Sequence, residues 1–351
     1  MSQRMSQRMT PRMSPHMSPH MSPHPEQNDP IDRAWVVWAS VIGGQMPYSR
    51  TRRVDVDHPF RGVATHEVDL DDVVQRAHAL GLALGERAAI SHSSAALVRG
   101  YPLPRALRLG SELHVSVPRP VRAPKGAGVR GHSIELPAIR AAHLLVVAPS
   151  TGELLPVPLV DEPLTLLTCA TQLAVPDLVA LADAMLRRAT VEHRPDPMLA
   201  ALTLSAGRPG HRRLVRAAPM CRAGVRSRAE TLLRLLIVQA GLPQPVVAHP
   251  VQSTGRSDEQ WAAEADLAWP QFGVLLEYEG DVHRTSRRRF VSDVRRCERY
   301  ADEGWRAMRA TRADLYDDPR ELLSRVARRL RDGGWQPPRR WRLREMKPAV
   351  A

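Results

Sequence analysis

The order of helix and strand signals in residues 227–332 constrains the fold of this 351-residue chain more than any other feature. A helical period is followed by three strand-like segments, a long charged helix, a further strand and a closing amphipathic helix. In chain order these segments are 227–242, 245–251, 261–270, 272–280, 286–303, 305–311 and 319–332. Because a helix separates the last strand from the third, we expect that strand to join in parallel and form a mixed α/β core.

Two acidic residues of this series, Asp266 and Glu277, lie on neighbouring strand segments with Gly273 in the turn between them. Adjacent strands can bring these carboxylates together, and paired carboxylates disfavour each other's ionisation unless a cation lies between them. A hard divalent ion such as Mg²⁺, or Mn²⁺ in its place, meets this need. Both residues are flanked by apolar side chains, which makes burial without a partner costly. The pattern therefore predicts a metal site at Asp266 and Glu277.

Other charged residues near this pair also have purely structural explanations. Glu230 follows Ser227 at the spacing of a capping box, in which it need only reach back to the Ser227 amide. Asp281 comes directly after a glycine, a common position for a turn residue. Asp293 and Arg296 are spaced to face each other on a helix, as a surface ion pair does.

The segments "SRAETLLRLL", "ADLAWPQFGVLLEYEGDVHR" and "DVRRCERYADEGWRAMRAT" resemble very-short-patch-repair-like endonuclease domains of the PD-(D/E)XK nuclease superfamily. The resemblance covers residues 227–330 and implies a restriction-endonuclease-like αβββαβ core. It also implies a Mg²⁺-dependent DNA endonuclease in which Asp266 and Glu277 are the metal ligands. By the same resemblance, Glu230 is the acidic residue of the first helix, and His283 is a proton shuttle or phosphate contact.

One position departs from the superfamily pattern. Two residues after the second acid the superfamily usually has a lysine that activates water, whereas this chain has Glu279. Domains of this branch commonly carry an acid there, which leaves Glu279 and His283 as the candidates for the general base. The alternative function is a catalytically inactive DNA-binding regulator of the antitoxin type.

The preceding residues 31–204 alternate short helical and strand signals, which predicts a smaller α+β domain without a catalytic cluster. Its stretches "HPFRGVA", "ISHSSAALVRGYPLP", "GHSIELP" and "LTLLTCATQLA" resemble AbiEi-like antitoxin proteins of actinobacteria. In those proteins a DNA-binding winged helix precedes this module, and the short stretch before Phe60 does not read as one, which leaves DNA binding by this half open. The resemblance implies a second copy of the chain or a protein of a toxin–antitoxin or defence system as a partner, and the endonuclease resemblance implies DNA. We expect His92 and His132 to be structural or surface histidines rather than ligands.

The remaining segments are expected to lie outside these two domains. Residues 1–30 begin with a proline-containing tetrapeptide repeat that cannot build a core, which predicts a disordered tail and no metal role for its recurrent histidines. Residues 205–226 are rich in Gly, Pro and Arg, as a linker is. The endonuclease-like domain then covers 227–335, and a basic tail covers 336–351.

The formal charge of +13 favours a polyanionic partner such as DNA, although an arginine-rich composition also arises from a GC-rich genome. The three cysteines lie far apart, which argues against a disulfide framework and against a cysteine zinc site. No apolar run reaches the ~18–20 residues needed to cross a bilayer, and no signal peptide is evident. We therefore expect a cytoplasmic protein without a membrane partner.

Overall fold

The computed structural model of the chain describes residues 37–39, 54–110, 112–135, 142–253, 261–279 and 287–344. Within these ranges helices and sheets are mixed, which confirms the predicted α/β class. The predicted tail over residues 1–30 lies outside the described residues, as do Asp281 and His283.

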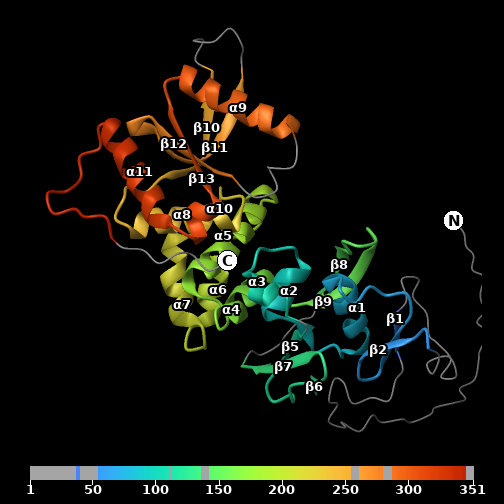
Figure 1. The fold of residues 1–351 in the computed structure, drawn as a ribbon. Helices are drawn as coiled ribbons and strands as arrows, with labels where there is room; N and C mark the ends of the chain where they lie inside the picture. The colour runs from blue at the N-terminus through green and yellow to red at the C-terminus, as the bar shows by residue number, and fades with distance from the viewer. Residues whose placement is uncertain are drawn as a thin grey trace, which may run out of the picture.

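The C-terminal half is built on a four-stranded sheet of order β10-β11-β12-β13 (Figure 1). Its elements are α8 (Arg228–Gln239), β10 (Val246–Gln252), β11 (Ala262–Trp269), β12 (Val274–Glu279), α9 (Arg287–Asp302), β13 (Arg306–Thr311), α10 (Arg312–Tyr316) and α11 (Pro319–Asp332). The first three strands pair antiparallel, and β13 pairs with β12 in parallel. The predicted αβββαβ order and the parallel addition of the last strand are confirmed.

Helices cover both faces of this sheet. On one face Leu267, Leu276 and Met308 share a buried core with the apolar sides of α8 and α11. On the other face Leu275 packs against Tyr300 of α9. Because alternate residues of a strand point to opposite faces, each strand side chain packs either toward α8 and α11 or toward α9.

The N-terminal half contains two further sheets. A three-stranded sheet has the order β1-β3-β2, and a six-stranded sheet has the order β6-β7-β5-β4-β9-β8. The strands are β1 (Val37–Ala39), β2 (Asp57–Phe60), β3 (Val63–Thr65), β4 (Ala89–Ile90), β5 (Leu113–Pro118), β6 (Lys125–Gly126), β7 (Val129–Ile134), β8 (Ala142–Val147) and β9 (Leu154–Leu159). Their helices are α1 (Val73–Ala83), α2 (His92–Val98) and α3 (Arg105–Arg108).

A bundle of four helices connects the two halves: α4 (Glu162–Cys169), α5 (Val175–Val191), α6 (Pro197–Ser205) and α7 (His211–Ala217). The expectation of a linker over residues 205–226 is wrong for the α7 segment. Leu214 and Ala217 of α7 are fully buried in the N-terminal core, so this stretch is packed structure. Its glycines and prolines delimit α7 and the 3-10 turn η1 (Ala218–Met220) that follows it.

A buried ion pair joins α5 to α8 across the expected domain boundary. The Arg234 guanidinium donates to Asp183 at 2.9 Å, and each side chain is 1% exposed. Thr231 donates to the same carboxylate oxygen at 2.8 Å. Burial raises the pKa of Asp183 even though Arg234 opposes that shift, because removal from water acts more strongly on the carboxylate. The first helix of the C-terminal half is thus fixed to the N-terminal half.

The expected basic tail beyond residue 335 is packed where the structure describes it, through residue 344. Trp335 and Trp341 contact each other edge to face and lie against the C-terminal core. The Trp341 indole donates to the Gly241 carbonyl at 2.7 Å, at the end of α8. This stretch therefore covers the core instead of forming a loose extension.

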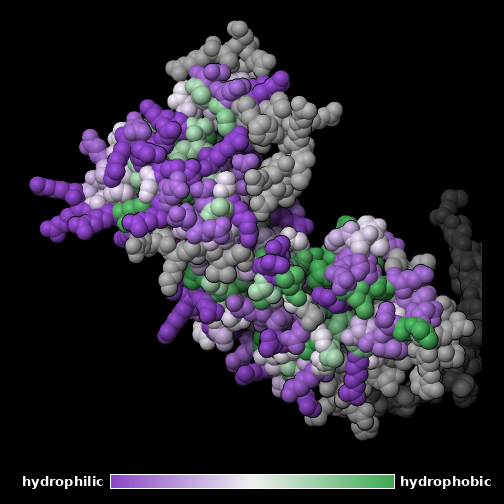
Figure 2. Space-filling model, in the orientation of Figure 1, coloured by the Kyte–Doolittle hydropathy of each residue, from purple (hydrophilic) through white to green (hydrophobic). Residues whose placement is uncertain are grey.

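The visible surface differs between the two halves (Figure 2). Hydrophilic side chains cover most of the C-terminal half in this view, whereas apolar patches occur over the N-terminal half. Exposed Leu145, Val147 and Leu154 on β8 and β9 are among the apolar residues of the N-terminal half. Among the described helices, none combines the length and the apolar character that crossing a membrane requires.

Candidate metal centre on the C-terminal sheet

Asp266 and Glu277 face each other across the β11–β12 pair. The antiparallel register runs through Trp269↔Val274 and Leu267↔Leu276, so the next opposed positions are Asp266 and Glu277. The ladder stops there. The Asp266 carboxylate accepts a hydrogen bond from the Tyr278 amide at 2.8 Å, in place of a backbone carbonyl of β11.

Both carboxylates point to the α9 side of the sheet. Their neighbours Leu267 and Leu276 pack toward α8 on the opposite face, and strand alternation therefore turns Asp266 and Glu277 toward α9. Tyr300 of α9 confirms this direction, because its hydroxyl donates to Glu277 at 2.9 Å. The structure thus brings together the two residues predicted to hold a metal.

The two carboxyl groups strongly affect each other's ionisation. Glu277 is 7% exposed, and burial followed by the charge of Asp266 raises the pKa of Glu277 to about 7. Burial also raises the pKa of Asp266, although the hydrogen bond from Tyr278 and the charge of Arg296 partly offset this. The two groups act directly on each other: the interaction raises the pKa of Glu277 and lowers that of Asp266, so Glu277 is the acid that holds a proton more readily.

Glu230 lies close to this pair but is held by other bonds. The Ser227 side chain caps α8 by accepting the Glu230 amide at 3.2 Å, as a capping box requires. The Glu230 carboxylate accepts the Arg226 amide at 2.9 Å and the Ser227 hydroxyl at 2.8 Å. Glu230 therefore contacts the Ser227 hydroxyl and the Arg226 amide, whereas the sequence suggested a contact with the Ser227 amide. Burial, and after it the charge of Asp266, raises the pKa of Glu230, so three acidic groups share this region.

Glu279 lies at the end of β12, on the same side of the strand as Glu277. It is half-buried and forms an ion pair with Arg309 of β13 at 3.7 Å. This contact places a cation beside the Glu279 carboxylate. His283 and Asp281 lie outside the described residues, and so does the side chain of Asp293.

Two residues of α9 belong to the site but were missed from the sequence. Tyr300 hydrogen-bonds Glu277, and Arg296 lowers the pKa of both Asp266 and Glu277 through its charge. The charge of Arg296 therefore acts on the carboxylates, while the expected pair with Asp293 involves a side chain outside the described residues. Their separation of four residues places Arg296 and Tyr300 on one helix face, a signal that the sequence did contain.

The donor set fits a hard divalent cation. Asp266 and Glu277 offer carboxylate oxygens from two adjacent strands, and their raised pKa values show that the positive charge of Arg296 offsets only part of the cost of burying the pair. Mg²⁺ binds through one or two carboxylates together with water and substrate phosphate oxygens. A divalent cation between the carboxylates would supply positive charge to both and would compete with the proton on Glu277.

Two curated proteins of Mycobacterium tuberculosis match part of the chain: uncharacterized protein MT2308 of strain CDC 1551 / Oshkosh and uncharacterized protein Rv2248 of strain H37Rv. Each is 28% identical to this chain over 171 residues, which is 47% of this chain and 59% of the relative. No family model matches the sequence, and no solved structure matches it significantly.

Proposed function

We propose that the C-terminal half is a Mg²⁺-dependent DNA endonuclease whose metal ligands are Asp266 and Glu277. The observation that carries this proposal is the opposed pair of carboxylates on β11 and β12, in which burial and the charge of Asp266 raise the pKa of Glu277 to about 7. The αβββαβ order of the surrounding elements supports it, since the sequence resemblance implies that core. Mn²⁺ would serve in place of Mg²⁺.

Bound Mg²⁺ would supply a water of lowered pKa and would neutralise charge on the scissile phosphate. The chain contributes the geometry. The amide of Tyr278 fixes one oxygen of Asp266, and the hydroxyl of Tyr300 fixes one oxygen of Glu277. Arg296 adds positive charge beside both carboxylates, where a DNA phosphate would approach.

We assign the general base to Glu279, with His283 as the second candidate. Glu279 is on the side of β12 that carries Glu277, and its half-exposed carboxylate is accessible to water. A carboxylate at this position can accept a proton from an attacking water, a role that contributes about 10²–10⁴-fold to a rate. For the whole chain we propose DNA as the partner, with a second copy or a toxin–antitoxin or defence protein as the protein partner.

The test is nicking of supercoiled plasmid by the full-length protein with Mg²⁺ or Mn²⁺. We expect Asp266→Asn and Glu277→Gln to lower the cleavage rate at least about 10³-fold, because each removes a ligand charge. Glu279→Gln should lower it about 10²-fold while Mg²⁺ binding persists. Glu298→Gln is the matched control, since Glu298 is an exposed carboxylate on α9 whose loss should leave cleavage unchanged.

Unchanged cleavage by Asp266→Asn would falsify the proposed site. Salt-sensitive DNA binding in EDTA, together with no cleavage under either metal, would support the alternative of a catalytically inactive DNA-binding regulator. Glu279 motivates that alternative, because it stands where the resemblance leads one to expect a catalytic lysine and because its carboxylate pairs with Arg309.

A further inference from the structure

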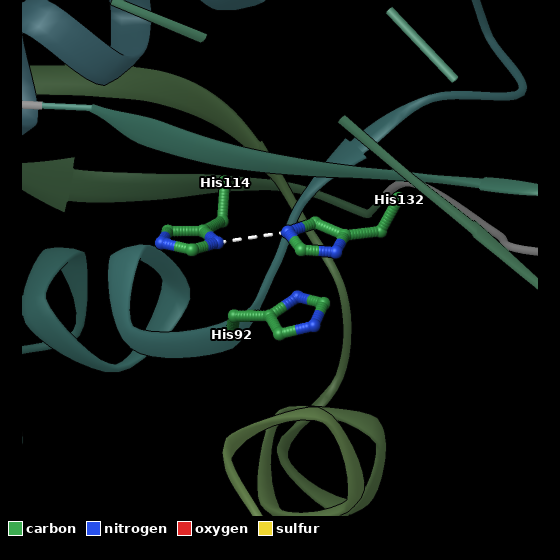
Figure 3. A group of neighbouring side chains, drawn as sticks. All are labelled: His92, His114 and His132. Carbon is green, nitrogen blue, oxygen red and sulfur yellow. Dashed lines mark hydrogen bonds between the residues drawn. The ribbon is translucent and has the colours of Figure 1, made fainter. Parts of the chain in front are cut away.

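Three histidines from separate segments of the N-terminal half lie together (Figure 3). His92 is the first residue of α2, His114 lies on β5, and His132 lies on β7. One ring nitrogen of each lies within 4.8 Å of the other two. The nearest approach is 2.8 Å, between Nδ1 of His114 and Nε2 of His132. The three histidines have no regular spacing in the sequence, so only the fold brings them together.

The sheet register explains why His114 and His132 meet. Strands β5 and β7 run parallel, with Ser116 opposite His132, so His114 lies two positions from that pairing on the same face. The His92 ring then stacks over His132, with ring centroids 3.8 Å apart and an angle of 24° between the rings. His92 and His114 are buried, whereas His132 is half-buried, which leaves one side of the group accessible.

The backbone at His92 is held in an unfavourable conformation that directs its ring to this place. Its φ is 55°, in the left-handed region that residues with a β-carbon seldom adopt. The Thr168 hydroxyl of α4 accepts the His92 amide at 3.1 Å, and the Ser91 hydroxyl contacts Nδ1 of the ring at 2.9 Å. Such conformations persist only where surrounding contacts enforce them, and they cluster at functional sites.

Burial favours the neutral form of all three rings. Burial lowers the pKa of His92 to about 2 and that of His114 to about 4, and the neighbouring histidines shift both in the same direction. Burial also lowers the pKa of His132. Neutral imidazoles keep a lone pair for a metal ion.

We propose that His92, His114 and His132 bind one divalent transition-metal ion, best satisfied by Zn²⁺, with water in the fourth position. Imidazole ligands suit Zn²⁺, whereas Mg²⁺ and Ca²⁺ prefer oxygen ligands. Zn–N bonds of about 2.0–2.1 Å in tetrahedral geometry place ligand nitrogens about 3.4 Å apart. To admit the ion, the His114 and His132 nitrogens, 2.8 Å apart, have to separate by less than about 1 Å. The His92 ring, stacked on His132, has to rotate so that its in-plane lone pair points at the same ion.

Gln172 of the segment after α4 is the positioning residue for this site. Its amide oxygen accepts the Ser93 amide at 3.0 Å, and its amide nitrogen donates to Nε2 of His114 at 3.2 Å. The ring proton of His114 therefore lies on Nδ1, facing His132. A metal bound at Nδ1 would require the His114 tautomer with its proton on Nε2. A Gln172 amide turned to present its oxygen would accept that proton, as partners of metal-bound histidines do, at the cost of its bond from the Ser93 amide.

The first test is the visible spectrum of the metal-free, full-length protein titrated with Co²⁺, in a version whose tail residues His16, His20 and His24 are alanine. We expect one equivalent of Co²⁺ to give the intense bands of four-coordinate Co²⁺ without a thiolate charge-transfer band. Zn²⁺ should displace it and raise the melting temperature. This measurement needs no change within the site. A weak, six-coordinate spectrum overturns the proposal, and so does an unchanged melting temperature with Zn²⁺.

The second test compares variants by competition of Zn²⁺ with a chromophoric chelator. His114→Gln and His132→Asn should each lower Zn²⁺ affinity at least about 100-fold, and His143→Gln, an exposed histidine on β8, should not. Gln172→Glu should raise affinity about tenfold, because a carboxylate accepts both the Ser93 amide and the His114 proton. Melting in EDTA establishes that each variant folds.

Equal Zn²⁺ affinity of wild type and both histidine variants overturns the site. Equal affinity of Gln172→Glu and wild type overturns the positioning role of Gln172. Asp266→Asn separates this site from the C-terminal site, since it should leave Zn²⁺ affinity unchanged and abolish DNA cleavage. Loss of Zn²⁺ binding in that variant would place the ion at the carboxylates instead.

Discussion

At the scale of single residues, the protonation of Glu277 determines how stability and cation affinity at the C-terminal site depend on pH. Burial and the neighbouring Asp266 raise its pKa from the usual 4.5 to about 7. Between these two values the folded protein holds a proton that the unfolded chain has released. Stability of the metal-free protein therefore falls as the pH rises through this window, and the Glu277→Gln substitution removes that dependence.

The same proton competes with Mg²⁺. Below pH 7 binding must displace it, so we expect the apparent association constant to fall about tenfold for each pH unit below the pKa. Calorimetric titrations with Mg²⁺ at pH 5.5, 6.5 and 7.5 measure this, and Glu298→Gln provides the control. A constant affinity over that range would show that Glu277 is not a ligand.

At the scale of elements, the junction of α5 and α8 depends on the buried pair of Asp183 and Arg234. The pair is nearly inaccessible to water, and Thr231 and the Arg222 amide also bond the carboxylate. Leu235 of the same helix lies in the N-terminal core, while Leu236 lies in the C-terminal core. Helix α8 therefore belongs to the packing of both halves.

Removing one partner of this pair leaves an uncompensated buried charge. We expect Arg234→Met to lower the free energy of unfolding by about 3–5 kcal/mol, and the double change with Asp183→Leu to recover much of that loss. Urea denaturation of the three proteins measures both effects. Equal stability of wild type and Arg234→Met would show that the pair contributes little to the junction.

At the scale of the whole molecule, the charge of +13 predicts salt-dependent DNA binding. If three phosphates are contacted, affinity should fall about fortyfold between 50 and 200 mM salt. We expect Arg295→Gln on α9 to reduce the slope of log affinity against log salt by about 1, since α9 covers the carboxylate face. Arg320→Gln on α11 is the matched control on the opposite face.

Fluorescence anisotropy with a labelled duplex in EDTA measures these slopes without cleavage. Equal reductions by Arg295→Gln and Arg320→Gln would contradict binding at the α9 face. Binding that is insensitive to salt would show that the excess of arginine is compositional and carries no DNA contact.

Much of the C-terminal fold was predictable because its signals are local. Strand alternation around Asp266 and Glu277 and the helical period of Leu232 and Leu236 placed each element, and the crossover predicted the parallel last strand. The packed α7 was missed, because glycine and proline at its ends obscured a short helix whose Leu214 is buried only by distant partners. Local composition carries no information about such partners.

The sequence by itself determined the αβββαβ order and the opposed acidic pair, because both follow from the periods of neighbouring segments and from a short turn. Only the tertiary structure decided that Tyr300 and Arg296 face that pair and that Asp183 is buried against Arg234. It also grouped the histidines of α2, β5 and β7, which sheet register and a left-handed backbone bring together. Contacts between residues far apart in the chain depend on how whole elements pack, and no local pattern encodes that packing.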